Sequence, residues 1–202
     1  MESAIDKFNN LFLKGQFRDA LNIANQELFK EKSATWFMYK AQCCYCLGDY
    51  EKALTYINKA EEDTPVSIDF DYNYWRSMVY NGMNEFEKAL ECIEKSIKVS
   101  PTLDKYRNKA AIYVEQGDYE NAINLYEQIN NTYEQDKITP LDWFYLASSY
   151  YQLDELQKAL SAINKCVLMS QDTSYCYTKS LILRKLGRLE DAEIWLKKSE
   201  EN

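Results

Sequence analysis

Hydrophobic positions along this chain of 202 residues recur with the spacing of amphipathic α-helices. Apolar side chains lie three or four positions apart, as in Phe37, Ala41 and Cys44. That period places them on one face of a helix, whereas a half-buried strand would alternate at every second residue. The pattern predicts an all-α chain of short amphipathic helices.

One short phrase recurs six times and separates consecutive helices. It begins with glycine or, at two places, with Asn84 or Asp154. These residue types tolerate the left-handed backbone that ends a helix, so the first position predicts a turn. An aromatic residue or leucine two positions later predicts the start of a second helix, and an alanine three positions further on predicts close helix packing. The alanines, Ala20, Ala53, Ala89, Ala122, Ala159 and Ala192, are separated by 33, 36, 33, 37 and 33 residues.

Proline occurs at the boundaries of the predicted helices and never interrupts one. Pro65 and Pro101 follow the second helices of two repeats, and Thr139 before Pro140 predicts a helix N-cap with proline at the first helical position.

These units resemble the tetratricopeptide repeat: aromatic, small and aromatic residues on the first helix, a turn glycine, an alanine on the second helix and a trailing proline. The resemblance covers residues 1–202, although Asn84 and Asp154 replace glycine and three repeats lack the proline. It implies a single domain, a right-handed superhelical solenoid of six antiparallel helix pairs. The predicted repeats are approximately 1–33, 34–67, 70–102, 103–136, 140–172 and 173–202.

In such a stack the first helices line the concave side, and residues beside their core stripes are predicted to line a groove. Aromatic and methionine side chains there would hold a peptide or helix by apolar burial. The alternative is that these rings pack between adjacent repeats. The predicted groove residues are Asn9, Phe12, Met38, Gln42, Tyr45, Tyr74, Met78, Asn81, Arg107, Phe144, Ser148, Tyr151, Tyr177 and Arg184.

The net charge of the chain indicates which kinds of partner it can bind. A net charge of -8 argues against nucleic acid, whose phosphates attract clustered Lys and Arg, and favours a basic or apolar protein partner. The first ten residues are polar, and the apolar cluster at 11–13 is too short for a signal peptide or a membrane span. We therefore expect a cytoplasmic protein that does not insert into membranes.

The sequence offers little for catalysis or for a cofactor. The chain has no histidine, and its glycines are used by turns rather than by a phosphate-binding loop. Cys43, Cys44 and Cys46 could suggest a metal cluster, but structural zinc usually needs four ligands in paired spacings. We interpret the three as buried, reduced thiols, and we expect no metal, no cofactor and no enzymatic activity.

The leading hypothesis is a non-catalytic protein-interaction module, either an adaptor or scaffold or an assembly factor. An alternative is an acidic chaperone or inhibitor that shields a basic or toxic partner protein. An unrecognised enzyme and an RNA-binding helical repeat are both disfavoured. The last hairpin, with Ile194 and Trp195, has no further helix to cover it and predicts self-association or partner contact, unless the neighbouring Lys and Glu residues solvate that face.

Overall fold

A computed structural model describes residues 3–65 and 70–200, and in these ranges it contains twelve α-helices, one short 3-10 helix and no strand. The predicted all-α fold of six helix pairs is confirmed. The parts of the predicted repeats that fall on 1–2, 66–69 and 201–202 lie outside the described residues, and the single-domain boundary 1–202 stays a prediction. Clustering of contacts divides the chain into two compact units, Met1–Ser100 and Pro101–Asn202, here called unit 1 and unit 2.

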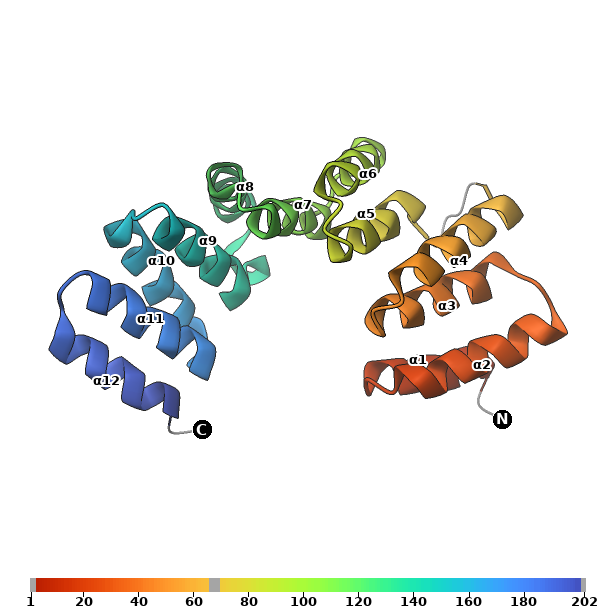
Figure 1. Cartoon of the computed structure of the whole chain (residues 1–202), viewed down its shortest axis with the longest axis horizontal. Helices are drawn as coiled ribbons and strands as arrows, with labels where there is room; N and C mark the ends of the chain where they lie inside the picture. The colour runs from red at the N-terminus through yellow and green to blue at the C-terminus, as the bar shows by residue number, and fades with distance from the viewer. Residues whose placement is uncertain (1–2, 66–69, 201–202) are drawn as a thin grey trace. The chain divides into compact units, whose positions relative to one another are not determined.

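Unit 1 consists of three helix pairs in which each helix packs against the next along the chain (Figure 1). The first two pairs enclose Phe8, and a second cluster around Met38 joins the second pair to the third. The helices are α1 (Ala4–Leu13), α2 (Phe17–Lys30), α3 (Ala34–Cys46), α4 (Tyr50–Asp63), α5 (Tyr72–Gly82) and α6 (Phe86–Val99).

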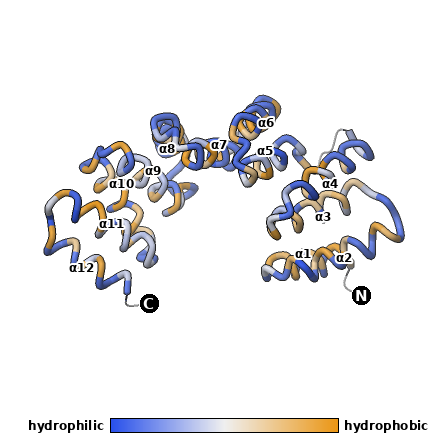
Figure 2. Tube along the Cα trace, viewed as in Figure 1, coloured by the Kyte–Doolittle hydropathy of each residue, from blue (hydrophilic) through white to orange (hydrophobic). Residues whose placement is uncertain are grey.

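Unit 2 repeats this arrangement around one continuous core that includes Tyr126, Ile163 and Leu183. Its helices are α7 (Leu103–Gln116), α8 (Tyr119–Thr132), the 3-10 helix η1 (Gln135–Lys137), α9 (Pro140–Gln152), α10 (Leu156–Met169), α11 (Thr173–Lys185) and α12 (Leu189–Glu200). Figure 2 shows hydrophobic and hydrophilic stretches following each other within single helices, as expected where one face of each helix is buried.

The turn between the two helices of each pair has the predicted left-handed backbone. The first residue of every phrase has a positive φ, including Asn84 at 59° and Asp154 at 62°. The second helix then begins at the aromatic residue or leucine in all six pairs. The repeated alanines are fully buried, with exposed fractions of 0% for five and 1% for Ala192. A larger side chain there would separate the helices, so the phrase sets both the turn and the packing distance.

The start of α9 also agrees with its prediction. Pro140 is the first helical residue and Thr139 is the N-cap. The Thr139 backbone N–H and hydroxyl both donate to Oδ2 of Asp142, at 2.8 and 2.9 Å. This reciprocal cap fixes the direction in which the chain enters α9.

Candidate protein-binding site

The predicted groove residues of unit 1 lie on the first helices α1, α3 and α5. Asn9 on α1 is exposed, and Gln42 on α3 is half-buried. On α5, Tyr74, Met78 and Asn81 are half-buried, which leaves part of each side chain at the surface. These five residues could contact a partner without any change in the fold.

Met38 is a wrong prediction, because its side chain is fully buried, with an exposed fraction of 0%. The helix α3 packs against α2 on one side and α4 on the other. The buried part of its surface is therefore wider than the single row of core residues predicted from the sequence. It includes Ala34 and Met38 together with Ala41 and Cys44. The predicted stripe residue Phe37 is only half-buried.

Two predicted groove rings in unit 1 take part in packing. The Phe12 ring centroid lies 5.7 Å from that of Phe8 and 5.1 Å from that of Phe17. The Tyr45 ring lies 5.9 Å from that of Tyr50 in the following helix. The Phe12 contacts lie within one helix pair, whereas Tyr45 also contacts the next pair, with its ring centroid 6.4 Å from that of Trp75, as the alternative of packing between adjacent repeats describes.

In unit 2, too, some predicted groove residues contact neighbouring side chains and others are partly exposed. Phe144 packs on Tyr175 of α11, with ring centroids 5.1 Å apart. Nζ of Lys185 lies 4.8 Å from the centroid of the Tyr151 ring. Ser148 is half-buried.

Helix α11 presents the most open part of the predicted site. Tyr177 has an exposed fraction of 49%, and Arg184, two helical turns further on, is also exposed. The adjoining face of the same helix is buried in unit 2 through Cys176, Ser180 and Leu183. Tyr177 and Arg184 are thus exposed beside the buried face of α11.

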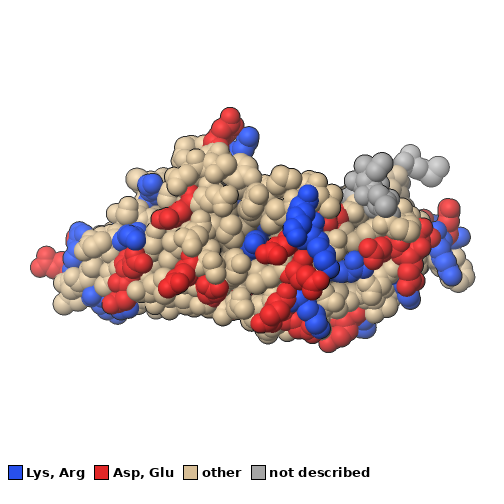
Figure 3. Space-filling view, turned by 90° about the horizontal axis from the view of Figure 1, so that it is seen from above, with Lys and Arg blue, Asp and Glu red and all other residues tan. Residues whose placement is uncertain are grey.

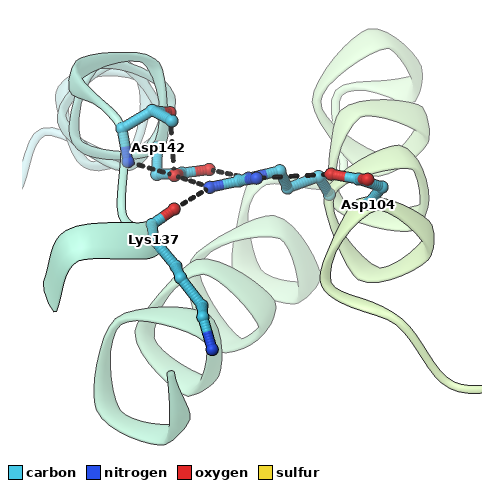
Figure 4. A network of polar contacts seen from close by, with 5 residues as sticks. Asp104, Lys137 and Asp142 are labelled. Atoms are coloured by element: carbon cyan, nitrogen blue, oxygen red, sulfur yellow. Dashed lines mark hydrogen bonds and ion pairs between the residues drawn. The ribbon is translucent and has the colours of Figure 1, made fainter. Parts of the chain in front are cut away.

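Arg107 on α7 belongs to a polar network that joins three elements of unit 2 (Figure 4). Its Nε and Nη2 donate to Oδ1 and Oδ2 of Asp142 at 2.8 and 2.6 Å, a bidentate pair. Nη2 also donates to the Lys137 carbonyl at 2.7 Å, and Nη1 reaches Asp104 at 3.3 Å. Arg107 therefore holds α7 against η1 and α9, and its guanidinium is occupied within the fold.

Asp142 was not among the predicted site residues, although the Thr-Pro-Leu-Asp order of a capping box marks it in the sequence. Burial by itself would raise the pKa of this carboxyl. The hydrogen bonds from the Arg107 guanidinium and from the Thr139 N–H and hydroxyl outweigh it and hold the pKa below the ordinary 3.8. The carboxylate is thus charged and fully engaged at neutral pH.

All six cysteines are free thiols. Cys43 and Cys44 are buried as predicted, and burial raises the pKa of Cys43 to about 12, so this thiol is protonated and a poor metal ligand or nucleophile. Cys46 is exposed, so the prediction of burial is wrong there, because it lies at the last turn of α3 beside the loop. Over the described ranges, no group of three Cys, Asp or Glu side chains is placed to hold a metal ion.

The C-terminal helix pair has the predicted partly open face. Ile194 has an exposed fraction of 55%, and Trp195 is half-buried. Nζ of Lys179 lies 3.6 Å from the Trp195 ring centroid, and Nζ of Lys198 lies 4.3 Å from it. The two lysines cover the indole, and Ile194 remains exposed as an apolar contact, as does Leu189 on the same helix. Self-association through this face stays a prediction.

The class of the protein follows from these observations: it is an all-α protein built of repeated helix hairpins. Family models for the tetratricopeptide repeat match residues 5–68 and 70–103, and the model of anaphase-promoting complex, cyclosome, subunit 3 matches residues 115–199. A TPR repeat-containing protein of Methanocaldococcus jannaschii is 34% identical over 108 residues, which cover 52% of this chain and 18% of that protein. The chain therefore matches less than a fifth of the length of this curated relative.

Solved structures show the same fold. A tetratricopeptide repeat protein from Parabacteroides merdae has a TM-score of 0.74 at 19% identity, covering 96% of this chain and 75% of that one. The structure of MamA 41-end from Desulfovibrio magneticus RS-1 has a TM-score of 0.70 at 17% identity, covering 83% and 93%.

The chain belongs to the tetratricopeptide repeat family. Repeats of this family form protein-interaction scaffolds that are typically non-enzymatic. Across the part of the chain that the structure describes, none of the helices combines the length and the apolar character needed to cross a bilayer.

Proposed function

We propose that this chain is a non-catalytic protein-interaction module, an adaptor, scaffold or assembly factor that binds a peptide or helix of another protein along its first helices. The observation that supports it best is the face of α11 with Tyr177 and Arg184. Tyrosine and arginine contribute most to binding when a partner buries them, and both side chains are exposed on α11.

The alternative of an acidic chaperone or inhibitor is less well supported. Shielding a basic partner calls for a continuous acidic surface. Figure 3 shows acidic and basic side chains interspersed over the face in view. On that face, opposite charge alone therefore does not favour a basic partner. We propose the cytoplasm as the location, because six free thiols suit a reducing compartment.

The test begins with the proteins that the whole chain retains from its native cytosol, identified by mass spectrometry. Each is then purified, and its affinity for the chain is measured by calorimetry. Tyr177→Ala should weaken the binding of the true partner about tenfold or more, the effect of losing an aromatic anchor at an interface.

The matched control is Phe29→Ala. This side chain has an exposed fraction of 93%, but it lies on the second helix α2. The control should leave the affinity unchanged. Equal binding by the wild type and Tyr177→Ala, or an equal loss in both variants, would show that the α11 face is not the binding surface.

A further inference from the structure

The helices α8, α9 and α10 of unit 2 enclose a hollow of about 350 Å³, within the range of ligand pockets, about 300–1,000 Å³. The second helices α8 and α10 form its walls, and the first helix α9 forms its floor. Each helix contributes residues three or four positions apart, so each turns one face toward the space. We call this space the α8–α10 hollow.

The floor of the hollow is aromatic. Trp143 and Tyr150 lie seven positions apart on α9, and both line the space while being more than nine-tenths buried. The Tyr150 hydroxyl donates a hydrogen bond to the Glu127 carboxylate on α8. Burial raises the pKa of Tyr150, so it remains a neutral donor. The floor is therefore rigid, and its one hydroxyl is already paired.

Asn130 on the α8 wall is the unusual feature. Its exposed fraction is 8%, yet neither Oδ1 nor Nδ2 has a hydrogen-bond partner in the described residues. Buried polar groups are almost always paired, because an unpaired one loses its bonds to water without replacement. A side-chain amide that offers a donor and an acceptor together is complementary to a second amide, which offers a C=O and an N–H in the same way.

The charged groups around the rim differ in their pairing. Lys158 forms an ion pair with Glu155 at 2.6 Å, whereas Glu127 accepts a hydrogen bond from the neutral Tyr150 hydroxyl and keeps its negative charge. Lys165 differs: its Nζ lies 4.0 Å from the Trp143 ring centroid, and it makes no ion pair with any residue that the structure describes. An acidic group beside Lys165 would be attracted to the one uncompensated cation at this rim.

We propose that the α8–α10 hollow binds an extended segment of a partner protein. A main-chain amide of the segment pairs with the Asn130 side chain, and an acidic residue lies beside Lys165, whose Nζ covers the Trp143 ring. This site is formed between second helices and is separate from the α11 face with Tyr177, so the two surfaces can be tested independently.

The test uses a displayed library of random linear peptides, selected against the whole chain. Synthetic copies of the selected peptides are then titrated into purified variants by calorimetry. Asn130→Leu, which keeps the approximate volume but cannot form hydrogen bonds, should weaken binding at least tenfold, equivalent to about 1.4 kcal/mol. Lys165→Gln should weaken the same peptides, with a smaller effect at high salt. The peptides should be enriched in Asp or Glu.

Asn124→Leu is the matched control, because Asn124 lies on the same helix with its side chain exposed. It should leave the affinity unchanged. The unfolding midpoint of Asn130→Leu should equal or exceed that of the wild type, since an unpaired buried amide is replaced by an apolar group, and this shows that the variant is folded.

Two results would overturn the proposal. One is that no peptide is selected, as expected if the hollow holds water alone. The other is that the selected peptides bind Asn130→Leu as they bind the wild type. If these peptides were instead lost with Tyr177→Ala, the α11 face would be the binding surface, and the function proposed above would stand without the hollow.

Discussion

Replacing Asp142 with alanine should destabilise unit 2 by about 3–5 kcal/mol, the range for breaking a buried ion pair by removal of one partner. The Asp142 side chain is 3% exposed and accepts four hydrogen bonds, two from Arg107 and two from Thr139. The substitution leaves the Arg107 guanidinium, 24% exposed, without its bidentate partner. It also removes the reciprocal cap of α9.

Asp104→Ala is the matched control. Asp104 contacts the same guanidinium at 3.3 Å, but its side chain is 79% exposed. Water screens such a contact, so its loss should change the free energy of unfolding little. Both carboxylates contact the same arginine, Arg107. The comparison therefore separates the effect of burial from the effect of removing a negative charge.

The stability should also depend on pH through Asp142. Its pKa in the folded chain lies below the ordinary 3.8. The folded state therefore favours the charged form, and the contribution is complete above the unfolded value and is lost as the pH falls through the folded pKa. The wild type should lose stability below about pH 4, whereas Asp142→Ala should lose less over the same interval.

Urea unfolding followed by far-ultraviolet circular dichroism measures both effects. A double-mutant cycle with Arg107→Met gives the coupling energy, and the double variant should be less destabilised than the sum of the single variants. If Asp142→Ala costs no more than Asp104→Ala, the network does not stabilise unit 2 and the reasoning is wrong.

Three other predictions concern packing and association. Ala122→Arg, at a position with 0% exposure, should cost about 1–3 kcal/mol or more by overpacking, and a thermal midpoint equal to the wild type would contradict the repeat register. Gly82→Ala places a Cβ 2.6 Å from the Tyr50 ring, so its midpoint should fall, and Tyr50→Leu in the same chain should restore part of the loss. Light scattering at high concentration should show wild-type self-association that Ile194→Lys removes, and a strictly monomeric wild type would refute it.

The sequence was sufficient to predict the helix pairs, because the features that set them are local. A left-handed turn depends on one residue, and Asn84 and Asp154 could be recognised as substitutes for glycine from their own chemistry. The burial of each alanine follows from its place three residues after the start of the second helix. These turn residues and alanines occur in every repeat, and the repetition allows them to be recognised in the sequence.

The site was harder to predict, because it depends on contacts between residues far apart in the chain. Arg107 and Asp142 are 35 positions apart, and no spacing rule connects them. Met38 was misplaced because helical periodicity gives the face of a helix but not the number of neighbours that cover it. The unpaired amide of Asn130 can be recognised only when the walls of the hollow are in place.

Asp142 and Trp143 are consecutive residues of α9, and they face different neighbours. Asp142 is hydrogen-bonded to Arg107 of α7, and Trp143 forms part of the floor of the α8–α10 hollow. Because both residues lie in the first turn of α9, a variant that weakens the Arg107–Asp142 pair is expected to lower the affinity of a ligand in the hollow, and by thermodynamic reciprocity that ligand should stabilise the pair by the same factor.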